Sequence, residues 1–242
     1  MSEHVFDIVT REIPYSGKCF LVLNRYDEAS FDADLSEQIN EAQGLGAHYF
    51  YFASRDKAFA PDEDFSAAGF TFQFYSDFDI LEKTLTAEDG PQYRLKCLNK
   101  TNAPLYTALF NEAFKDVPNA VTIDDPEIQR ILGEPFEAGF LMLGAEPQGV
   151  FELDFSGEMA EIAAVAIRPG LQGAGRGHMA MRTLEQDLFR RGHAKIQLLV
   201  ASANVRAAGL YKARGYCHAR RLSRWYSLSP AGSVSYPPDS PR

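Results

Sequence analysis

The sequence has little cysteine and no long hydrophobic run. Its three cysteines, Cys19, Cys97 and Cys217, stand far apart among 242 residues and have no metal-ligand spacing. A disulfide scaffold and a structural zinc are therefore not expected. Nowhere do about 18 consecutive apolar residues occur, and the start lacks a basic region followed by an apolar stretch. The sequence therefore predicts neither membrane spanning nor secretion, and a cytoplasmic location is expected.

The overall composition is that of a folded protein. Hydrophobic residues make up 45% and charged residues 24% of the chain, which is typical of soluble globular proteins. A chain of 242 residues is long enough for one large domain or two small ones, each with its own core.

Charge is distributed unevenly along the chain. Residues 1–98 carry 8 basic and 18 acidic side chains, residues 99–167 carry 3 and 12, and residues 168–225 carry 12 and 2. The overall net charge of −9 argues against a general polyanion-binding protein. The basic block from Arg168 onward fits either solvated decoration or an enzyme that holds an anionic cofactor beside a cationic substrate. Nucleic-acid binding through this block is disfavoured, because stacking aromatic residues are sparse there.

The first 90 residues predict a small domain of strands and one helix. Period-two patterns predict strands at 6–13, 19–26, 48–56 and 69–80, with breaker residues at 60–69. A helix is predicted at 31–47, since Phe31, Leu35, Ile39 and Ala42 recur at helical spacing. The polar segment 84–92 predicts a domain boundary. The expected organisation is a domain over 1–90, a second domain over 91–228 and a disordered tail over 229–242.

The second domain predicts alternating helices and strands. Strands are expected at 93–99, 138–146, 149–156, 161–167, 195–204 and 218–228, and helices at 103–114, 124–133 and 205–216. The two strands before residue 157 form a predicted hairpin whose turn is Pro147, Gln148 and Gly149. A further amphipathic helix has Ala180, Leu184 and Leu188 on one face. The fold class is therefore α/β (α+β), with a mixed sheet flanked by helices.

A glycine-rich loop precedes this amphipathic helix. It contains Gly170, Gly173, Gly175 and Gly177, and free main-chain N–H groups at a helix start favour a phosphate. The loop is not a P-loop, because Arg176 and Gly177 replace the required Lys and Ser or Thr. It is not a Rossmann fingerprint either, because His178 replaces the third glycine. Simple tight turns are the alternative interpretation.

Two motifs together resemble the GNAT superfamily of acyl-CoA-dependent N-acetyltransferases. Gln172-Gly-Ala-Gly175-Arg-Gly177 is similar to the family's Q/R-x-x-G-x-G/A signature, located after a strand and before a helix. The segment from Asn204 through Ala207, Leu210 and Tyr211 to Gly215-Tyr216 resembles its N-x-x-A-x-x-L-Y-x-x-x-G-F/Y segment. The likeness covers residues 159–217 and extends from about 93 to 228. The N-terminal third is similar to the back half of a GNAT fold without its glycine loop, as in tandem GNAT proteins.

The resemblance implies a cofactor site for acetyl-CoA and no metal. The main-chain groups of Val165, Ala166 and Ile167 would pair with the pantetheine arm. The loop residues Gln172, Gly173, Ala174, Gly175, Arg176 and Gly177 would bind the diphosphate, with Arg168 and Arg176 supplying positive charge. Asn204 is expected to hold the pantetheine or the neighbouring backbone, and capping of the following helix is the alternative.

The resemblance also implies two catalytic residues. Glu161 would be the general base that removes a proton from the amine, and a solvent-facing strand residue is the alternative. Tyr211 would be the acid that protonates the leaving thiolate, and a core tyrosine is the alternative. His178 and His193 are interpreted as structural or solvent-facing. Four acids, Asp116, Asp124, Asp125 and Glu127, are candidates to receive a cationic amine, although acids at a helix start more often complement the helix dipole.

The predicted function is therefore transfer of an acetyl group from acetyl-CoA to a primary amine of a small molecule, by direct attack in a ternary complex. The expected protein is a monomer or a homodimer that binds neither nucleic acid nor membrane. Two alternatives are acetylation of a protein or peptide amine, and a non-catalytic acyl-CoA-binding sensor.

Overall fold

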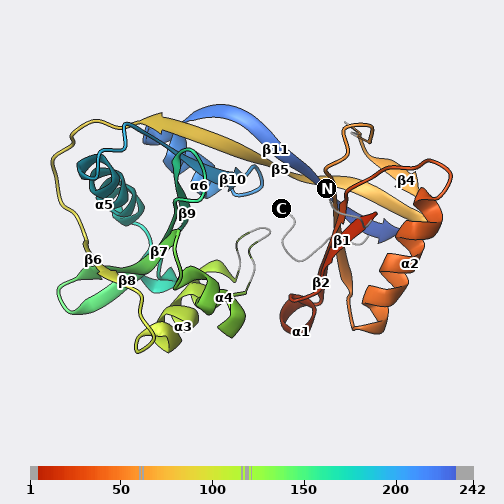
Figure 1. Cartoon of the computed structure of the whole chain (residues 1–242), viewed down its shortest axis with the longest axis horizontal. Coiled ribbons are helices and arrows are strands. Elements are labelled where there is room, and N and C mark those ends of the chain that lie inside the picture. The colour runs from red at the N-terminus through yellow and green to blue at the C-terminus, as the bar shows by residue number, and fades with distance from the viewer. Residues whose placement is uncertain are drawn as a thin grey trace. The chain divides into compact units, whose positions relative to one another are not determined.

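The computed structural model describes residues 5–59, 61, 63–115, 117, 120 and 122–232. The chain divides by its contacts into two compact units. Unit 1 comprises Met1–Phe78, Ala201–Ala203 and Arg221–Arg242, and unit 2 comprises Asp79–Val200 and Asn204–Arg220. Two long strands, β5 (Phe70–Thr84) and β11 (Cys217–Pro230), contribute residues to both units (Figure 1). The boundary near residue 90 stays a prediction, as does the tail, most of which, residues 233–242, lies outside the described residues.

Unit 1 is a mixed sheet with one long helix. Its strands are β1 (Phe6–Val9), β2 (Lys18–Leu23), β3 (Tyr49–Ser54), β4 (Phe65–Ala67), the first part of β5 and the last part of β11, and its helices are α1 (Ile13–Ser16) and α2 (Phe31–Gly44). The strand order is β1-β2-β3-β11-β5, with β4 beside β5. The pair β2–β3 is parallel, while β1–β2, β3–β11 and β4–β5 are antiparallel.

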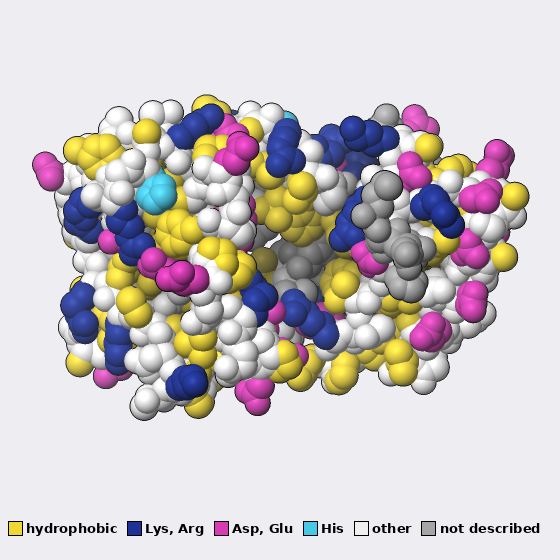
Figure 2. All heavy atoms as spheres, viewed as in Figure 1, with side chains coloured by type: hydrophobic (Ala, Val, Ile, Leu, Met, Phe, Trp, Pro, Cys, Tyr) yellow, Lys and Arg dark blue, Asp and Glu magenta, His cyan; other side chains and the backbone are white. Residues whose placement is uncertain are grey.

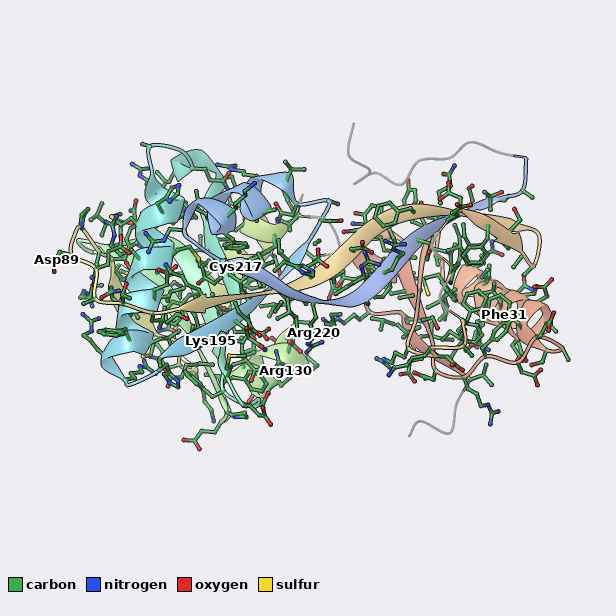
Figure 3. All side chains as sticks on the ribbon, turned by 90° about the horizontal axis from the view of Figure 1, so that it is seen from above. Phe31, Asp89, Arg130, Lys195, Cys217 and Arg220 are labelled. Carbon is green, nitrogen blue, oxygen red and sulfur yellow. The ribbon has the colours of Figure 1, made fainter. Side chains whose placement is uncertain are left out.

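The helix α2 buries the apolar side chains that its periodicity predicts. Phe31, Leu35, Ile39 and Ala42 are each no more than 5% exposed, and they pack on one face of the unit 1 sheet. The ring of Phe31 lies 6.2 Å from that of Phe52 and 4.8 Å from that of Phe59, centroid to centroid. Figure 3 shows Phe31 among the packed side chains of this unit. Aromatic packing of this kind stabilises a small core, so the aromatic strands of the N-terminal third have a structural role.

Unit 2 is a mixed sheet with helices on both faces. Its elements are β6 (Arg94–Cys97), α3 (Ala103–Phe114), α4 (Asp125–Ile131), β7 (Phe136–Leu143), β8 (Glu146–Asp154), β9 (Ala160–Ile167), the 3₁₀ turn η1 (Pro169–Leu171), α5 (Arg176–Arg190), β10 (Lys195–Ala201) and α6 (Val205–Ala213). The strand order is β5-β10-β9-β8-β7-β6. The pair β9–β10 is parallel, and the pairs from β9 to β6 are antiparallel.

Side chains alternate between the two faces of this sheet, as the strand period requires. Phe151 and Leu153 of β8 pack with α5, whose Ala180, Leu184 and Leu188 are fully buried as predicted. Val150 of the same strand packs instead with α3 and α4. The helices therefore lie in two layers around the sheet (Figure 1), and the predicted α/β fold class is confirmed.

The hairpin β7–β8 has a different turn from the predicted one. The turn is Gly144 and Ala145, and Gly144 has a positive φ of 63°. Pro147 lies inside β8 opposite Met142, where the register shifts. A strand tolerates proline at such an irregularity, and glycine has the lower cost at a positive φ. The prediction of a turn at residues 147–149 was therefore wrong, because it gave the proline more weight than the glycine three residues earlier.

The polar segment 85–93 lies along α5. We call these residues the strap. The Leu85 N–H donates to the Ala194 carbonyl at 2.9 Å. Gln186 of α5 donates to the Thr86 carbonyl and accepts from the Glu88 N–H. The Tyr93 N–H donates to the Thr183 hydroxyl. Asp89 of the strap points away from α5 (Figure 3). The strap is thus an ordered part of unit 2.

Candidate active site

The glycine-rich loop joins the end of β9 to the start of α5 in an unusual backbone conformation. Gly173, Ala174 and Gly175 have φ angles of 92°, 48° and 73°. Three consecutive residues in this region of φ are rare, and for Ala174 the conformation is strained. A Cβ atom on Gly173 or Gly175 would meet no atom within 4 Å. Gly173 and Gly175 are therefore suited to the positive φ angles, and the absence of their side chains leaves open space beside the loop.

Several main-chain N–H groups of the loop and of the first turn of α5 lack a protein partner within the described residues. Within the described residues, no acceptor is found for the N–H groups of Gly173, Ala174, Gly175, Gly177 and His178. By contrast, the Gln172 N–H donates to the Pro169 carbonyl at 3.3 Å and the Arg176 N–H to the Gly173 carbonyl at 3.0 Å. The first turn of α5 contains no acidic side chain. Free amides at the positive end of a helix dipole form a site for an anion such as phosphate.

Three side chains brace the loop. The Gln172 amide nitrogen donates to the Ile167 carbonyl at 2.9 Å, and its oxygen accepts from the guanidinium of Arg206. The Arg176 guanidinium donates to the Leu171 carbonyl at 2.7 Å. Gln172 and Arg176, both predicted to bind the cofactor, thus also hold the loop in shape. Sequence reasoning missed Arg206, which occupies a variable position within the motif that begins at Asn204.

The two parallel strands beside the loop separate along their length. Between β9 and β10 the paired residues are Ala160 with Ile196, Glu161 with Gln197, and Ile162 with Leu198. Both strands continue for several residues beyond the last pair, and Ala163 is exposed. The backbone of β9 from residue 163 to 167 therefore has an open side toward β10. Val165, Ala166 and Ile167, predicted to pair with pantetheine, lie in this opened part.

A β-bulge in β9 determines which residues face each helix layer. Glu152 of β8 pairs with Ala164, whereas its neighbour Leu153 pairs with Ile162, so Ala163 is the extra residue. A bulge shifts the alternation of side chains by one position. As a result Ala164 packs with α3 and α4, while Ile162 packs with α5.

Glu161 lies on the α3 and α4 face, immediately before this bulge. It pairs across the sheet with Asp154 of β8 and Gln197 of β10. Its carboxylate accepts a hydrogen bond of 2.8 Å from the Gln197 side chain, and the residue is partly exposed. The opposite face of the sheet carries α5. A carboxylate at this position is accessible to a proton donor that approaches from the α3 and α4 side.

A second carboxylate on the same face is buried. Glu152 is 6% exposed and accepts a hydrogen bond of 3.1 Å from Arg130, which also binds Glu127. Burial raises the pKa of Glu152, and the charge of Arg130 opposes this shift. The Arg130 guanidinium stacks 4.1 Å from the centre of the Phe136 ring. This contact set joins α4 to the sheet and leaves Glu161 as the more accessible carboxylate.

Asn204 begins α6, and its side chain caps this helix. Its Oδ1 accepts a hydrogen bond of 3.1 Å from the Ala207 N–H. The structure therefore shows the N-cap contact, and within the described residues the side-chain NH₂ has no protein acceptor. At the start of α5, a Cβ on Gly177 would meet Leu210 of α6 at 3.3 Å. The missing side chain at Gly177 thus allows α5 and α6 to approach closely.

Tyr211 lies in the last turn of α6 and packs on unit 2. Its ring centre is 5.7 Å from that of Tyr216, and both residues contact the core below α5. Burial raises the pKa of Tyr211 to about 12. At neutral pH the phenol therefore keeps its proton. Within the described residues no protein acceptor is found for this hydroxyl.

The acidic residues near α4 mostly have partners inside the protein. Asp124 is the N-cap of α4 and accepts a hydrogen bond of 3.1 Å from the Glu127 N–H. Asp125 lies in the first turn of that helix, and Asp116 lies outside the described residues. These contacts favour helix capping for the described acids. His193 stacks on Phe155, with 5.7 Å between ring centres, and His178 is exposed.

Tertiary contacts neutralise much of the basic block. Six of its twelve basic residues pair with acids from earlier segments: Arg182 and Arg214 with Glu88, Arg191 with Glu137, Lys195 with Glu82, and Arg221 and Arg224 with Asp77. On the face seen in Figure 2, basic and acidic side chains are interspersed. Arg168, Arg176 and Arg206 flank the glycine-rich loop, so only a small part of the block contributes charge there.

In the part of the chain that the structure describes, no group of three or more His, Cys, Asp or Glu residues is arranged to hold a metal ion. None of the helices in this part combines the length and the apolar character that crossing a membrane requires.

Solved structures of GNAT proteins share this fold at low sequence identity. A GCN5-related N-acetyltransferase from Sphaerobacter thermophilus matches with a TM-score of 0.56 and 14% identity, covering 92% of this chain and 75% of the other. One from Kribbella flavida matches with 0.54 and 14%, covering 89% and 82%. A tandem GNAT protein from the clavulanic acid biosynthesis pathway matches with 0.51 and 12%, covering 91% and 77%. These likenesses establish the fold, including its partial GNAT-like N-terminal part.

Sequence comparison finds a similarity to the same family in the second half of the chain. No curated protein matches the chain. Residues 104–216 match the family model of the Acetyltransferase (GNAT) family, and this range includes the glycine-rich loop, β9, β10 and α6. The site therefore lies within a segment, residues 104–216, that matches the model of the GNAT acetyltransferase family.

Proposed function

We propose that unit 2 transfers an acetyl group from acetyl-CoA to the primary amine of a small molecule, by direct attack in a ternary complex. The observation that carries this proposal is the set of five amides between Gly173 and His178, all except that of Arg176, that lack a partner within the described residues, beside the point where β9 separates from β10. The amides suit a diphosphate, and the opened strand suits an extended arm with amide groups. Coenzyme A combines both chemical features.

The loop and its flanking arginines would bind the cofactor's phosphates. Amide N–H groups of the loop donate to the diphosphate oxygens, and the dipole of α5 adds favourable charge. Arg168 and Arg206 supply countercharge from either side of the loop. The backbone of Val165, Ala166 and Ile167 has its open side toward the pantetheine amides, which pair with it as an added strand would.

Glu161 and Tyr211 would manage the protons of the reaction. The amine nitrogen attacks the thioester carbonyl carbon, and its proton passes to Glu161, directly or through water. A main-chain N–H in the opened part of β9 stabilises the oxyanion. The C–N bond remains, the C–S bond breaks, and the thiolate takes a proton from the Tyr211 hydroxyl. Proton exchange with solvent restores both residues.

Calorimetric titration tests the cofactor part of this proposal. Acetyl-CoA and CoA are expected to bind unit 2 of the intact chain with a stoichiometry of one. Pantetheine, which lacks the diphosphate, is expected to bind at least tenfold more weakly, because charge-assisted hydrogen bonds contribute about 1.5–3 kcal/mol each. Absence of heat with both CoA compounds would overturn the proposal.

An acceptor panel tests the transfer itself. Thiol release from acetyl-CoA is measured with polyamines, aminoglycosides, amino acid amides and lysine peptides. Small amines are expected to accelerate release more than peptides do. Preference for lysine peptides would redirect the proposal to a protein amine acetyltransferase. Cofactor binding without acceleration by any amine would favour an acyl-CoA sensor.

The Glu161→Gln variant tests the assigned base. Glutamine preserves the size of the side chain but cannot accept the amine proton, so kcat is expected to fall about 100-fold. Affinity for CoA is expected to stay unchanged, because the loop and the opened strand are untouched. Glu158→Gln, an exposed change in the preceding loop, is the matched control. A kcat equal to that of the control would remove Glu161 from the mechanism.

A further inference from the structure

The helix α6 carries Tyr211 but is held by few apolar contacts. None of the residues in Val205–Ala213 is fully buried. Its apolar side chains, including Leu210 and Tyr211, are partly buried against the core below α5. Burial of apolar side chains is the usual source of helix stability in proteins. The position of α6 must therefore depend strongly on polar contacts at its ends.

The C-terminal end of α6 is fixed by a buried arginine. Arg214 is the C-cap residue, and its N–H donates to the carbonyls of Leu210 and Tyr211, both at 3.0 Å. Gly215 follows with a φ of 83°, and the Tyr216 N–H also donates to the Tyr211 carbonyl. This is the hydrogen-bonded ending of a helix with a left-handed glycine. Tyr211 is thus joined to Arg214 through the main chain.

The side chain of Arg214 enters an ion cluster below α5. It is 8% exposed and binds Glu185 of α5, which is 1% exposed. It also donates to both oxygens of the Glu88 carboxylate in the strap, at 3.0 and 2.6 Å. Lys83 donates to Glu185 at 2.6 Å, and Arg182 of α5 donates to Glu88 at 2.7 Å. The cluster of Lys83, Glu88, Arg182, Glu185 and Arg214 therefore connects α5, the strap and α6.

We infer that Arg214 is a positioning residue for Tyr211. Its ion pair with Glu185 of α5 holds the last turn of α6 at a set distance from α5. This places the Tyr211 hydroxyl beside the thioester sulfur. Only Arg214 among the three cations of the cluster lies on the chain segment of α6 and its cap. This inference depends on the proposed function, because it assigns Arg214 to the proton donation by Tyr211.

The chain provides a matched control for this inference. Arg182 binds the same carboxylate, Glu88, and is 21% exposed on its side chain, but it belongs to α5 and, among the described residues, forms no hydrogen bond or ion pair with α6. Arg182→Met removes one ion pair of the strap, whereas Arg214→Met removes the connection from α6. Arg214→Lys keeps the positive charge on a shorter side chain. It replaces Arg214→Met if that variant fails to fold.

A spectroscopic measurement tests the inference without any acceptor. Tyr211 is replaced by 3-fluorotyrosine in the full chain, and its fluorine resonance is followed while CoA is added. In the parent and in Arg182→Met, one sharp resonance that shifts on CoA addition is expected. In Arg214→Met or Arg214→Lys, a broadened or multiple resonance is expected, with less than a threefold change in CoA affinity. A sharp, parent-like resonance in the Arg214 variants would overturn the inference.

A kinetic cycle separates positioning from general stability. With the best amine of the acceptor panel, Tyr211→Phe is expected to lower kcat about 100-fold and Arg214→Met about tenfold. In the Tyr211→Phe background, Arg214→Met is expected to cause no further loss, because its effect passes through the hydroxyl. Equal losses in both backgrounds would overturn the inference, as would an unchanged kcat in Tyr211→Phe. Failure of CoA to bind any variant, parent included, would instead count against the proposed function.

Discussion

The segments β2–α2–β3 of unit 1 and β9–α5–β10 of unit 2 are built to one plan and differ in three details. Each is a pair of parallel strands connected by a helix that packs on the sheet. In unit 1, all six residues of β2 pair with β3, from Lys18 with Tyr49 to Leu23 with Ser54. In unit 2, only three pairs form before the strands separate. Of these two parallel pairs, the one in unit 2 thus leaves part of a strand unpaired on the side that faces its partner.

The loops before the two helices differ in what their amides bind. In unit 1, the Tyr26 N–H donates to the Asp56 carboxylate at 2.6 Å, and the Ala29 N–H donates to the Asp27 carboxylate at 3.0 Å. The loop 24–30 contains no glycine. In unit 2, the N–H groups of Gly173, Ala174, Gly175, Gly177 and His178 have no protein acceptor within the described residues. The loop amides of unit 1 therefore bind carboxylates of the protein itself, whereas those of unit 2 are free to bind an external anion.

The first turns of the helices complete the contrast. The first turn of α2 contains Asp32 and Asp34, whereas that of α5 contains no acid. Acidic side chains at a helix start compensate the dipole. The same architecture therefore has a stabilised helix start in unit 1 and an uncompensated one in unit 2. The comparison shows that an anion site at a helix start requires main-chain N–H groups without a protein acceptor and a first turn without acidic side chains.

The largest expected effect comes from closing the loop of unit 2. Gly175→Val places a β-branched residue at a φ of 73° and a side chain in the open space, so CoA affinity is expected to fall more than about 100-fold by calorimetry. Gly170→Ala in the same loop, where a Cβ also meets no atom within 4 Å and no positive φ is required, is the control. If the two variants bound CoA equally well, the loop would not be the anion site.

A smaller effect is expected when the start of α5 is made to resemble that of α2. His178→Glu introduces an acid into the first turn, which compensates the dipole and repels a diphosphate. A loss of CoA affinity of about tenfold is expected, and the loss should shrink at high salt. His178→Gln is the neutral control. An unchanged affinity in the glutamate variant would show that the helix dipole contributes nothing to cofactor binding.

The ion cluster predicts an acid-sensitive contribution to the stability of unit 2. Hydrogen bonding from Arg214 lowers the pKa of Glu88 from 4.5 to about 2, against the opposing effect of burial. A lowered pKa in the folded state stabilises the protein above about pH 4.5, and this stabilisation is lost as the pH falls toward 2. Glu88→Gln is therefore expected to lower the urea midpoint at pH 7 and to converge with the parent near pH 2.

The control for that prediction comes from the other helix. Glu41→Gln, an exposed change on α2, is expected to leave the urea midpoint at both pH values where the parent has it. If the difference in urea midpoint between Glu88→Gln and the parent stayed constant across this pH range, that result would contradict the assigned pKa shift.

The smallest expected effect concerns the closed loop of unit 1. The amide N–H groups of Tyr26 and Ala58 lower the pKa of Asp56, so its carboxylate is charged at neutral pH. Asp56→Ala frees both amides but leaves β2 and β3 paired over their whole length. The stoichiometry of CoA binding is therefore expected to stay at one. A stoichiometry of two would show that occupied amides, and not the closed strand pair, prevent binding in unit 1.

Local patterns in the sequence were enough to predict most elements and the likeness of the second half to the GNAT family. The period of Phe31, Leu35 and Ile39 predicted α2, and that of Ala180, Leu184 and Leu188 predicted α5, because one face of each helix must be apolar to pack on a sheet. The glycines of the loop and the segment from Asn204 to Tyr216 indicated the GNAT fold. The assigned roles of Glu161 and Tyr211 stay predictions.

Other features depend on residues that are distant in sequence. The short parallel pairing of β9 with β10 and the occupation of the unit 1 amides by Asp56 result from how separate segments meet. The sequence by itself determined the periodicities, the positive-φ glycines and the motif, since these are properties of neighbouring residues. Only the tertiary structure decided which amides remain free, where strands separate and that Arg214 reaches Glu185, because hydrogen bonds and ion pairs between segments depend on distances that no local pattern records.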